Sequence, residues 1–342
     1  MADIDADALV LGAGVIGLTT AICLAEAGLT VVLSAAEPPA QTTSVAAGAI
    51  WGPHLVGMDN RVERWAAVTQ DRLATLSHPE LGASGLAGIV RTASGVTASR
   101  EHSPTPPEFA ASACDLAPCS PDRIPVGYES AWRLTATIVS MPGYLDYLAR
   151  RYERTGGFSA FGVKVGTLAD AAHLAPSARV IVNCTGCGAR DLVPDPDVTP
   201  VRGQVVVAAN PGLTEFFVGT GSDPGDLTYL FPHGDVVVLG GTEQPGDWSL
   251  EPDPATATQI VAACSAIEPS LHNAPILGHR VGLRPARTAV RLEAVHQKTV
   301  HPETGREGEV TIVHNYGHGG AGVTLSWGCA EDAAELVLAE LG

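Results

Sequence analysis

Three glycines near the N-terminus have a spacing that predicts a ligand-binding turn. In a turn from a strand to a helix, Gly12 permits the tight turn, Gly14 lets a ligand approach the backbone, and Gly17 lets the helix pack on the strand. The N-terminus of such a helix favours a pyrophosphate. The turn predicts a dinucleotide site, but by itself it does not decide between FAD and a nicotinamide cofactor. The whole motif is Gly12-Ala13-Gly14-Val15-Ile16-Gly17.

An acidic residue is expected near the end of the following strand, where it would bind the ribose. That strand ends in Ser34-Ala35-Ala36, and the nearest acid is Glu37, about twenty residues past Gly17. Glu37 contacts either the ribose or only solvent, and the sequence leaves both open.

Two further pairs of residues have spacings that could carry chemistry. His314 and His318 stand four residues apart, but the glycines around them deny a helical register and no third ligand is evident, so no metal site is predicted. Cys184 and Cys187 form a Cys-x-x-Cys pair that invites a redox role. A packing role is favoured over thiol chemistry.

The elements that must position these residues follow from the hydrophobic pattern. An apolar strand at 8–11, a helix at 18–27 and a strand at 30–33 form a βαβ unit around the glycine turn. Further helices are predicted at 61–76, 144–154, 256–267 and 331–341. Further strands are predicted at 179–183, 204–208, 228–231, 236–239 and 311–314.

This order of elements predicts an α/β chain with two domains. A Rossmann-like nucleotide-binding domain is assembled from discontinuous segments, and an α+β substrate domain with a large antiparallel sheet is inserted between them. The nucleotide-binding domain comprises residues 1–55, 140–195 and 280–342. The substrate-binding domain comprises residues 56–139 and 196–279.

Composition restricts the class of protein. The 342 residues are 45% hydrophobic and 17% charged, which suits a chain with a large buried core. With 20 basic and 37 acidic residues the formal charge is −17, so we expect no binding to nucleic acid or to an anionic membrane. The 7 cysteines are scattered, and no signal peptide or membrane span is recognised. A reduced, cytoplasmic location is therefore expected.

The longer motifs of the chain resemble the D-amino-acid oxidase family, FAD-dependent enzymes that include D-aspartate oxidase. The matches cover essentially the whole chain in the family's order, and the last two blocks together are highly specific. The four main blocks are Val10–Thr19, Val45–Gly48, Val281–Arg287 and His314–Thr324. Smaller matches are Asn183–Gly186, Arg202–Gln204, Tyr229–Pro232 and Leu239–Thr242.

This resemblance implies noncovalently bound FAD and oxidative deamination of a D-amino acid to a 2-oxo acid, ammonia and hydrogen peroxide, with oxygen as acceptor. A hydride would pass from the substrate Cα to flavin N5, so no side chain need act as acid or base and orientation becomes the main task. Arg284 matches the arginine that binds the substrate carboxylate, and Tyr229 matches the tyrosine whose hydroxyl meets the same group. Gly320 matches the glycine whose carbonyl accepts from the substrate amine. A homodimer is left open.

The glycine run before the last helix matches the family's flavin contacts. Its amides and the helix dipole would stabilise negative charge at the N1–C2=O side of the reduced flavin, and Thr324 would hydrogen-bond that edge. The cofactor contacts that the resemblance implies are Gly12, Ala13, Gly14, Val15, Ile16, Gly17, Glu37, Thr42, Thr43, Ser44, Ala46, Ala47, Gly48, Val165, Cys184, Thr185, Gly186, Arg284, Gly317, His318, Gly319, Gly320, Gly322, Val323 and Thr324.

Two departures from the family bear on the substrate. D-aspartate oxidases would bring arginines for a second carboxylate, but the aligned positions here are Val218 and Glu243. Glu243 would repel an acidic side chain, so the chain is expected to prefer neutral or basic D-amino acids over D-aspartate. Gly225 stands where the mammalian enzymes have a second tyrosine in an active-site lid, which implies an open or differently gated entrance.

Other activities stay open at this point. They are a related flavin amine oxidase or dehydrogenase of the glycine or sarcosine oxidase kind, a D-aspartate oxidase, and an FAD-binding structural or sensor protein. A protein without catalysis would not need Arg284, Tyr229 and Gly320 together, which argues against the last. The D-stereochemistry rests on the resemblance alone.

Overall fold

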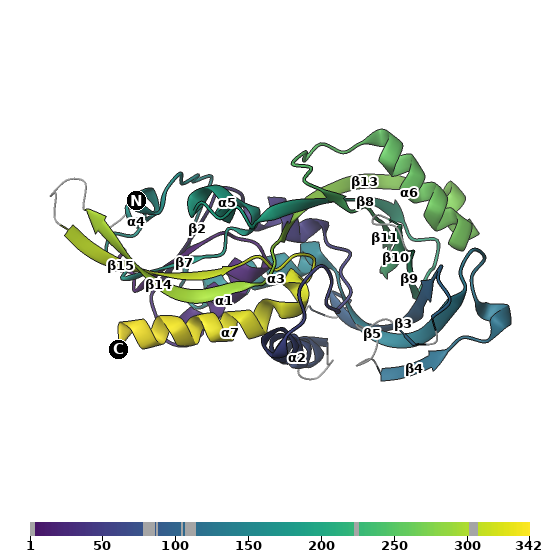
Figure 1. Cartoon of the computed structure of the whole chain (residues 1–342), viewed down its shortest axis with the longest axis horizontal. Coiled ribbons are helices and arrows are strands. Elements are labelled where there is room, and N and C mark those ends of the chain that lie inside the picture. The colour runs from purple at the N-terminus through teal and green to yellow at the C-terminus, as the bar shows by residue number, and fades with distance from the viewer. Residues whose placement is uncertain are drawn as a thin grey trace.

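Two β-sheets organise the chain, one of six strands and one of nine (Figure 1). The structure is a computed structural model that describes residues 4–77, 86, 88–103, 105–106, 114–221, 226–300 and 307–342. In Figure 1 the C-terminal helix runs along the six-stranded sheet, and the nine-stranded sheet forms the other end of the elongated molecule.

The six-stranded sheet is formed by short apolar strands whose central members are buried on both faces, as expected for parallel strands between layers of helices. Its order is β14-β15-β7-β1-β2-β6, and every pair is parallel except β14 with β15. The strands are β1 (Ala8–Leu11), β2 (Val31–Ala35), β6 (Phe158–Phe161), β7 (Val180–Asn183), β14 (Arg291–Val300) and β15 (Glu307–Tyr316).

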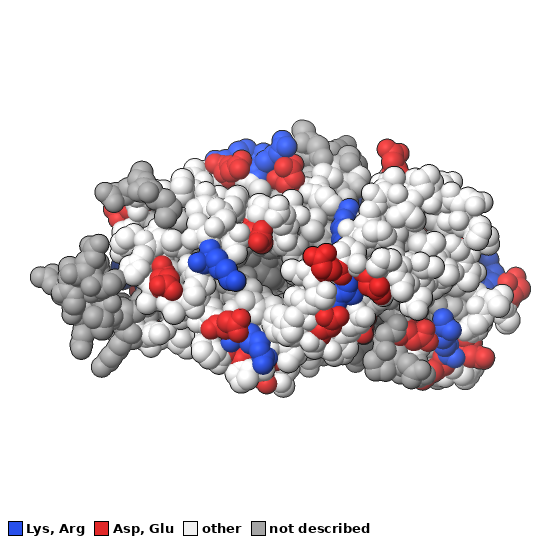
Figure 2. All heavy atoms as spheres, turned by 90° about the horizontal axis from the view of Figure 1, so that it is seen from above, with Lys and Arg blue, Asp and Glu red and all other residues white. Residues whose placement is uncertain are grey.

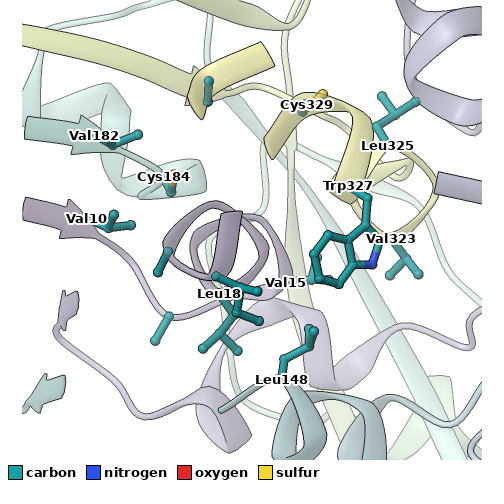
Figure 3. Packing of buried hydrophobic residues seen from close by; sticks show 14 of the residues in the cluster. Val10, Val15, Leu18, Leu148, Val182, Cys184, Val323, Leu325, Trp327 and Cys329 are labelled. Carbon is teal, nitrogen blue, oxygen red and sulfur yellow. The ribbon is translucent and has the colours of Figure 1, made fainter. Parts of the chain in front are cut away.

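Helices pack on both faces of this sheet. On one face Val10 and Val182 meet Leu18, Leu148 and Trp327 in the largest apolar cluster (Figure 3). The helices on that side are α1 (Val15–Glu26), α2 (Asn60–Ser77), α3 (Met141–Arg154) and α7 (Gly322–Leu341). The short helices α4 (Leu168–Ala172) and α5 (Ala189–Leu192) contribute to a second cluster with the strand residues of opposite parity, such as Leu9 and Ile181.

The nine-stranded sheet is mixed. Its order is β12-β8-β11-β10-β9-β3-β5-β4, with β13 pairing on the other side of β8. We expected a large antiparallel sheet, and every pair in it is antiparallel except β3 with β9, which run parallel. The strands are β3 (Val90–Ser99), β4 (Cys114–Pro118), β5 (Ser130–Val139), β8 (Thr199–Ala209), β9 (Phe216–Thr220), β10 (Leu227–His233), β11 (Val236–Gly240), β12 (Gln244–Pro245) and β13 (Ile276–Ala286).

Helix α6 (Pro254–Ile267) covers one face of the larger sheet, and Asp253 caps it by accepting hydrogen bonds from the backbone of Ala255 and Thr256. Ile260 and Cys264 pack there on Leu230 and other strand residues. The opposite face carries an apolar row that includes Tyr229 and Phe231. Alternation along β10 therefore directs this row away from α6.

The helices and strands predicted from the sequence are all present, although most of their limits differ by a few residues. The last helix begins at Gly322 rather than at 331, because the apolar residues of its first turns, Val323, Leu325 and Trp327, are buried in the largest apolar cluster, and Gly328 touches the Trp65 backbone of α2. Strand β13 crosses residue 280, where we expected a domain boundary. Gly225, the lid position, lies outside the described residues. None of the described helices has the length and hydrophobicity of a membrane span.

Charged side chains are sparse on the surface. On the face in Figure 2, basic side chains stand beside acidic ones, with wide areas that carry neither. Ion pairs such as Arg64 with Asp332 and Arg72 with Glu331 also place basic side chains beside acidic ones.

Candidate active site

A cavity of about 800 Å³ opens between the two sheets. Its lining takes residues from the ends of β1 and β2, from the segment between β2 and α2, and from β10, β13 and the start of α7. Every predicted contact residue lines it except Gly17 and Gly317. The fold thus gathers segments that are far apart in the sequence into one site.

The glycine turn forms one end of the cavity. Gly12 has φ +106°, which a residue with a side chain rarely adopts, and a Cβ there would lie 2.5 Å from the carbonyl oxygen of Cys184. A Cβ on Gly17 would lie 1.8 Å from the Gly12 carbonyl oxygen, so Gly17 acts in packing rather than in contact with a ligand. Ser44 Oγ accepts from the Val15 amide at 2.9 Å. The serine thereby satisfies one free donor at the N-terminus of α1.

The end of β2 forms the neighbouring wall. Glu37 is exposed and lines the cavity just after this strand. Ser34 is buried, and its Oγ has no hydrogen-bond partner among the described residues. The sequence pointed to Glu37 but not to Ser34, whose only signal is its place at the carboxyl end of a strand.

Tyr229 and Arg284 lie on the wall formed by the nine-stranded sheet. The Tyr229 ring stacks on Phe231 with centroids 4.9 Å apart, and burial raises the pKa of its hydroxyl, with Arg284 opposing the shift. Arg284 Nη1 donates to the Thr242 carbonyl at 2.9 Å. Its guanidinium lies over Gly203, where a Cβ would approach Nη1 to 2.5 Å. The tyrosine and the guanidinium are thus adjacent. Phe231 lies two residues further along β10, and strand alternation could have predicted that it lines the same wall as Tyr229.

His54 and Glu243 form an ion pair close to this wall, with His54 Nε2 2.7 Å from Glu243 Oε1. The hydrogen bond from His54 lowers the pKa of Glu243, although burial opposes it. His54 lines the cavity, and its carbonyl accepts from the Gly320 amide at 3.0 Å. Glu243 therefore stays ionised near Arg284.

The glycine loop, residues 317–320, forms the opposite wall together with the start of α7. Gly319 has φ +55° and its amide donates to the Pro285 carbonyl at 2.9 Å. Burial lowers the pKa of His318 to about 3, so this imidazole is neutral. The Thr324 hydroxyl donates to the Gly52 carbonyl at 2.8 Å and accepts from its amide at 3.1 Å. That hydroxyl already has two protein partners, which the sequence did not suggest.

The cysteine pair does not have the features of reactive thiols. Burial raises the pKa of both Cys184 and Cys187 to about 12. The Cys187 thiol donates to the Leu283 carbonyl at 3.4 Å. Both thiols are therefore protonated near neutral pH, and protonated thiols are poor nucleophiles.

His314 lies outside the cavity lining, edge-on to the Tyr316 ring.

The cavity fits FAD on three counts. Its volume suits a large ligand, and at Gly14 the nearest atom to an added Cβ would be Ser44 Oγ at 3.1 Å, so a side chain would intrude on the turn. Buried polar atoms on the lining that have no hydrogen-bond partner in the described part of the protein include Ser34 Oγ, Asn315 Oδ1 and His318 Nε2. Such atoms are expected where a polar ligand binds.

Comparison with known proteins agrees with this site. The family model for FAD dependent oxidoreductase matches residues 7–336, and the chain belongs to that family. It is similar to a D-amino-acid oxidase of Rubrobacter xylanophilus, at 43% identity over 98% of this chain and 97% of that protein. A D-amino-acid oxidase of Streptomyces coelicolor is 42% identical over 97% of each chain. Human D-aspartate oxidase is 33% identical over 96% of this chain and 93% of its own.

Solved structures share the fold at lower identity. Glycine oxidase from Geobacillus kaustophilus aligns with a TM-score of 0.76 and 18% identity, covering 98% of this chain and 95% of that one. Glycine oxidase from Bacillus cereus gives 0.72, also with 18% identity over 98% of this chain and 95% of that one. The predicted fold class is confirmed by the family and by these neighbours. The FAD cofactor is confirmed by the family and by the D-amino-acid oxidase relatives.

Proposed function

We propose that the protein is an FAD-dependent oxidase that deaminates D-amino acids to 2-oxo acids, with release of ammonia and hydrogen peroxide. The observation that carries this proposal is the placement of Arg284 beside Tyr229 in the same cavity as the glycine loop. The D-amino-acid oxidases at 42% and 43% identity support the same activity over a D-aspartate oxidase at 33%.

Arg284 is proposed to bind the substrate carboxylate. Its Nη1 is fixed by the Thr242 carbonyl, which orients the planar guanidinium, and a planar fork can donate to both carboxylate oxygens. Tyr229, whose raised pKa keeps it protonated, donates a further hydrogen bond to the same group. Together these residues hold the carboxylate end of the substrate on the larger sheet.

Gly320 is proposed to accept a hydrogen bond from the substrate amine through its carbonyl oxygen. A Cβ at this position would lie 2.4 Å from His54 Cδ2, so a side chain would press the loop out of place. Bound FAD supplies the acceptor for the hydrogen and two electrons that leave the substrate Cα. The task of the chain is then to hold carboxylate and amine so that the Cα–H bond is aimed correctly.

The cofactor contacts are proposed as predicted, with the glycine turn at the pyrophosphate and the start of α7 at the flavin. The amides at the N-terminus of α7 can stabilise negative charge, since the first turn of a helix carries free donors and a positive dipole end. For the ribose, Glu37 and Ser34 both lie on the cavity wall at the end of β2. We also propose the domain division given above, and the presence of two separate sheets supports a division into two domains.

The substrate side chain is proposed to be neutral or basic. An acidic side chain would meet the ionised Glu243, while Val218 offers no charge to balance it. Burying an unpaired carboxylate is costly. D-alanine or D-arginine should therefore have a higher kcat/KM than D-aspartate, and Glu243→Arg should narrow that gap. The reverse ranking in the unaltered protein would overturn this part of the proposal.

The activity is tested by anaerobic spectra of the purified protein before and after addition of D-alanine and, separately, L-alanine. Bleaching of the oxidised flavin band by the D-isomer alone is the expected result. Bleaching by neither isomer, or by both, would contradict the proposal. Arg284→Leu is the matched variant, and it should retain the flavin band but lose the bleaching.

A further inference from the structure

Asp195 lies outside the cavity, yet it joins two parts of the site. This aspartate follows α5 and is 6% exposed. Its Oδ2 accepts from the Tyr316 hydroxyl at 2.7 Å and from Arg287 Nε at 3.1 Å. Hydrogen bonds from Tyr316 and Arg287 lower the pKa of Asp195, although its burial opposes the shift. A buried carboxylate that accepts hydrogen bonds from two distant segments holds these segments together strongly.

Each of its two partners stands a few residues from a group that is proposed to hold the substrate. Arg287 directly follows β13, three residues after Arg284. Tyr316 ends β15 and directly precedes the glycine loop that contains Gly320. Asp195 therefore connects the carboxylate-binding strand to the amine-binding loop.

The contacts around this connection are tight. A Cβ on Gly317 would lie 2.8 Å from Arg287 Cδ, so the stem of the arginine lies flat against the loop. Arg291 Nη1 donates to the Tyr316 hydroxyl at 2.7 Å, which leaves that hydroxyl its proton for Asp195. The second carboxylate oxygen, Asp195 Oδ1, accepts from the Asp197 amide at 3.1 Å. The carboxylate is thus held on both sides and has little freedom to move.

We infer that Asp195 is a positioning residue that sets the distance between Arg284 and the Gly320 carbonyl. This distance decides how well an amino acid fits when its carboxylate and its amine are bound at the same time. This inference rests on the proposed function. A displacement of about 1 Å in a positioned reactant can cost about a hundredfold in rate. Without the carboxylate, Arg287 and Tyr316 lose their common acceptor and the loop can shift relative to β13.

The test compares two ligands that differ only in the amine. D-alanine needs both the carboxylate contact with Arg284 and the amine contact with the Gly320 carbonyl. Propionate has the same carbon chain and carboxylate but no amine. The variant is Asp195→Asn, and the control is Asp197→Asn, the same chemical change at an exposed residue 3.9 Å from Arg287. Propionate binding is read from the perturbation of the flavin absorption band, and D-alanine from KM and kcat.

In Asp195→Asn the kcat/KM for D-alanine should fall roughly tenfold or more, while the Kd of propionate changes by less than about twofold. In Asp197→Asn both should stay within about twofold of the unaltered protein. Equal losses for D-alanine and propionate would overturn the inference, since they would indicate general loosening. So would an unchanged kcat/KM in Asp195→Asn.

A second variant guards against misfolding. Tyr316→Phe keeps the ring and removes only the hydroxyl that donates to Asp195. It should reproduce the split between D-alanine and propionate with a smaller loss, and an absence of any split in this variant would also count against the inference. If the unaltered protein oxidises no D-amino acid, the proposed function fails and the inference with it. If it oxidises D-alanine and both variants behave like it, only the inference fails.

Discussion

The glycine turn and the wall that carries Tyr229 and Arg284 differ in the kind of group that would bind a ligand. The turn comprises residues 12–17, and its binding groups are backbone amides between β1 and α1. The wall takes Tyr229 from β10 and Arg284 from β13, and β8 and β11 lie between these two strands. The turn should therefore be most sensitive to added bulk, while the wall should be most sensitive to changes of chemistry.

The largest effect is expected at the wall, from the loss of the arginine fork. Arg284→Lys keeps the charge but loses the paired donors, so kcat/KM for D-alanine should fall roughly a thousandfold, or about 4 kcal/mol. Steady-state kinetics measures the loss, and the flavin content of the purified variant is the control. A loss below tenfold would show that the charge alone suffices.

At the turn, adding one methyl group should act through sterics. Gly17→Ala places a Cβ 1.8 Å from the Gly12 carbonyl oxygen, and the resulting strain should lower the free energy of unfolding by about 3 kcal/mol. Gly14→Ala is the matched control, because its Cβ would approach Ser44 Oγ only to 3.1 Å. Urea unfolding of the FAD-free proteins measures both. Similar losses in the two variants would remove the distinction between packing and cavity-lining glycines.

Acid should lower the stability of the folded protein through His314, a buried histidine of β15. Burial lowers the pKa of His314 to about 4, below about 6.5 in the unfolded chain, so the unfolded state binds more protons and stability falls as pH drops below 6.5. Between pH 6.5 and 5 this histidine should cost about 2 kcal/mol. His314→Gln should reduce the difference between urea unfolding at pH 7 and pH 5. The same exchange at the exposed His279 should leave it unchanged.

A smaller effect is expected from the second carboxylate contact on the wall. Tyr229→Phe removes one hydrogen-bond donor but keeps the ring that stacks on Phe231, so kcat/KM should fall about tenfold. The control is the Kd of FAD, which should not change. A loss as large as that of Arg284→Lys would mean that the ring position, rather than the hydroxyl, had been disturbed.

The smallest effect is expected at the turn again, where a side chain assists the backbone. Ser44→Ala removes the acceptor of the Val15 amide and should cost about 1 kcal/mol of stability in urea unfolding. Ser44→Thr keeps a hydroxyl and should lose less. If the alanine variant were as stable as the unaltered protein, the N-terminus of α1 would not need this partner.

Much of the glycine turn could be predicted from the sequence, because the residues that determine it are close together in the chain. The limits of β1 and the place of α1 followed from an apolar run and three glycines. The wall that carries Tyr229 and Arg284 was predicted only through motifs that resemble a family. Strand periodicity cannot give the parallel pairing of β3 with β9, since their contact depends on elements more than a hundred residues apart. For the same reason the His54–Glu243 pair could not be foreseen as an ion pair.

By itself the sequence determined the dinucleotide turn, the order of strands and helices, and a composition suited to a large core. These depend on local propensity and on the spacing of apolar residues, which act over a few turns or strands. Only the tertiary structure decided which polar groups meet. It brought Asp195 between Arg287 and Tyr316 and set Glu243 against His54, because such contacts join residues that are far apart in the sequence.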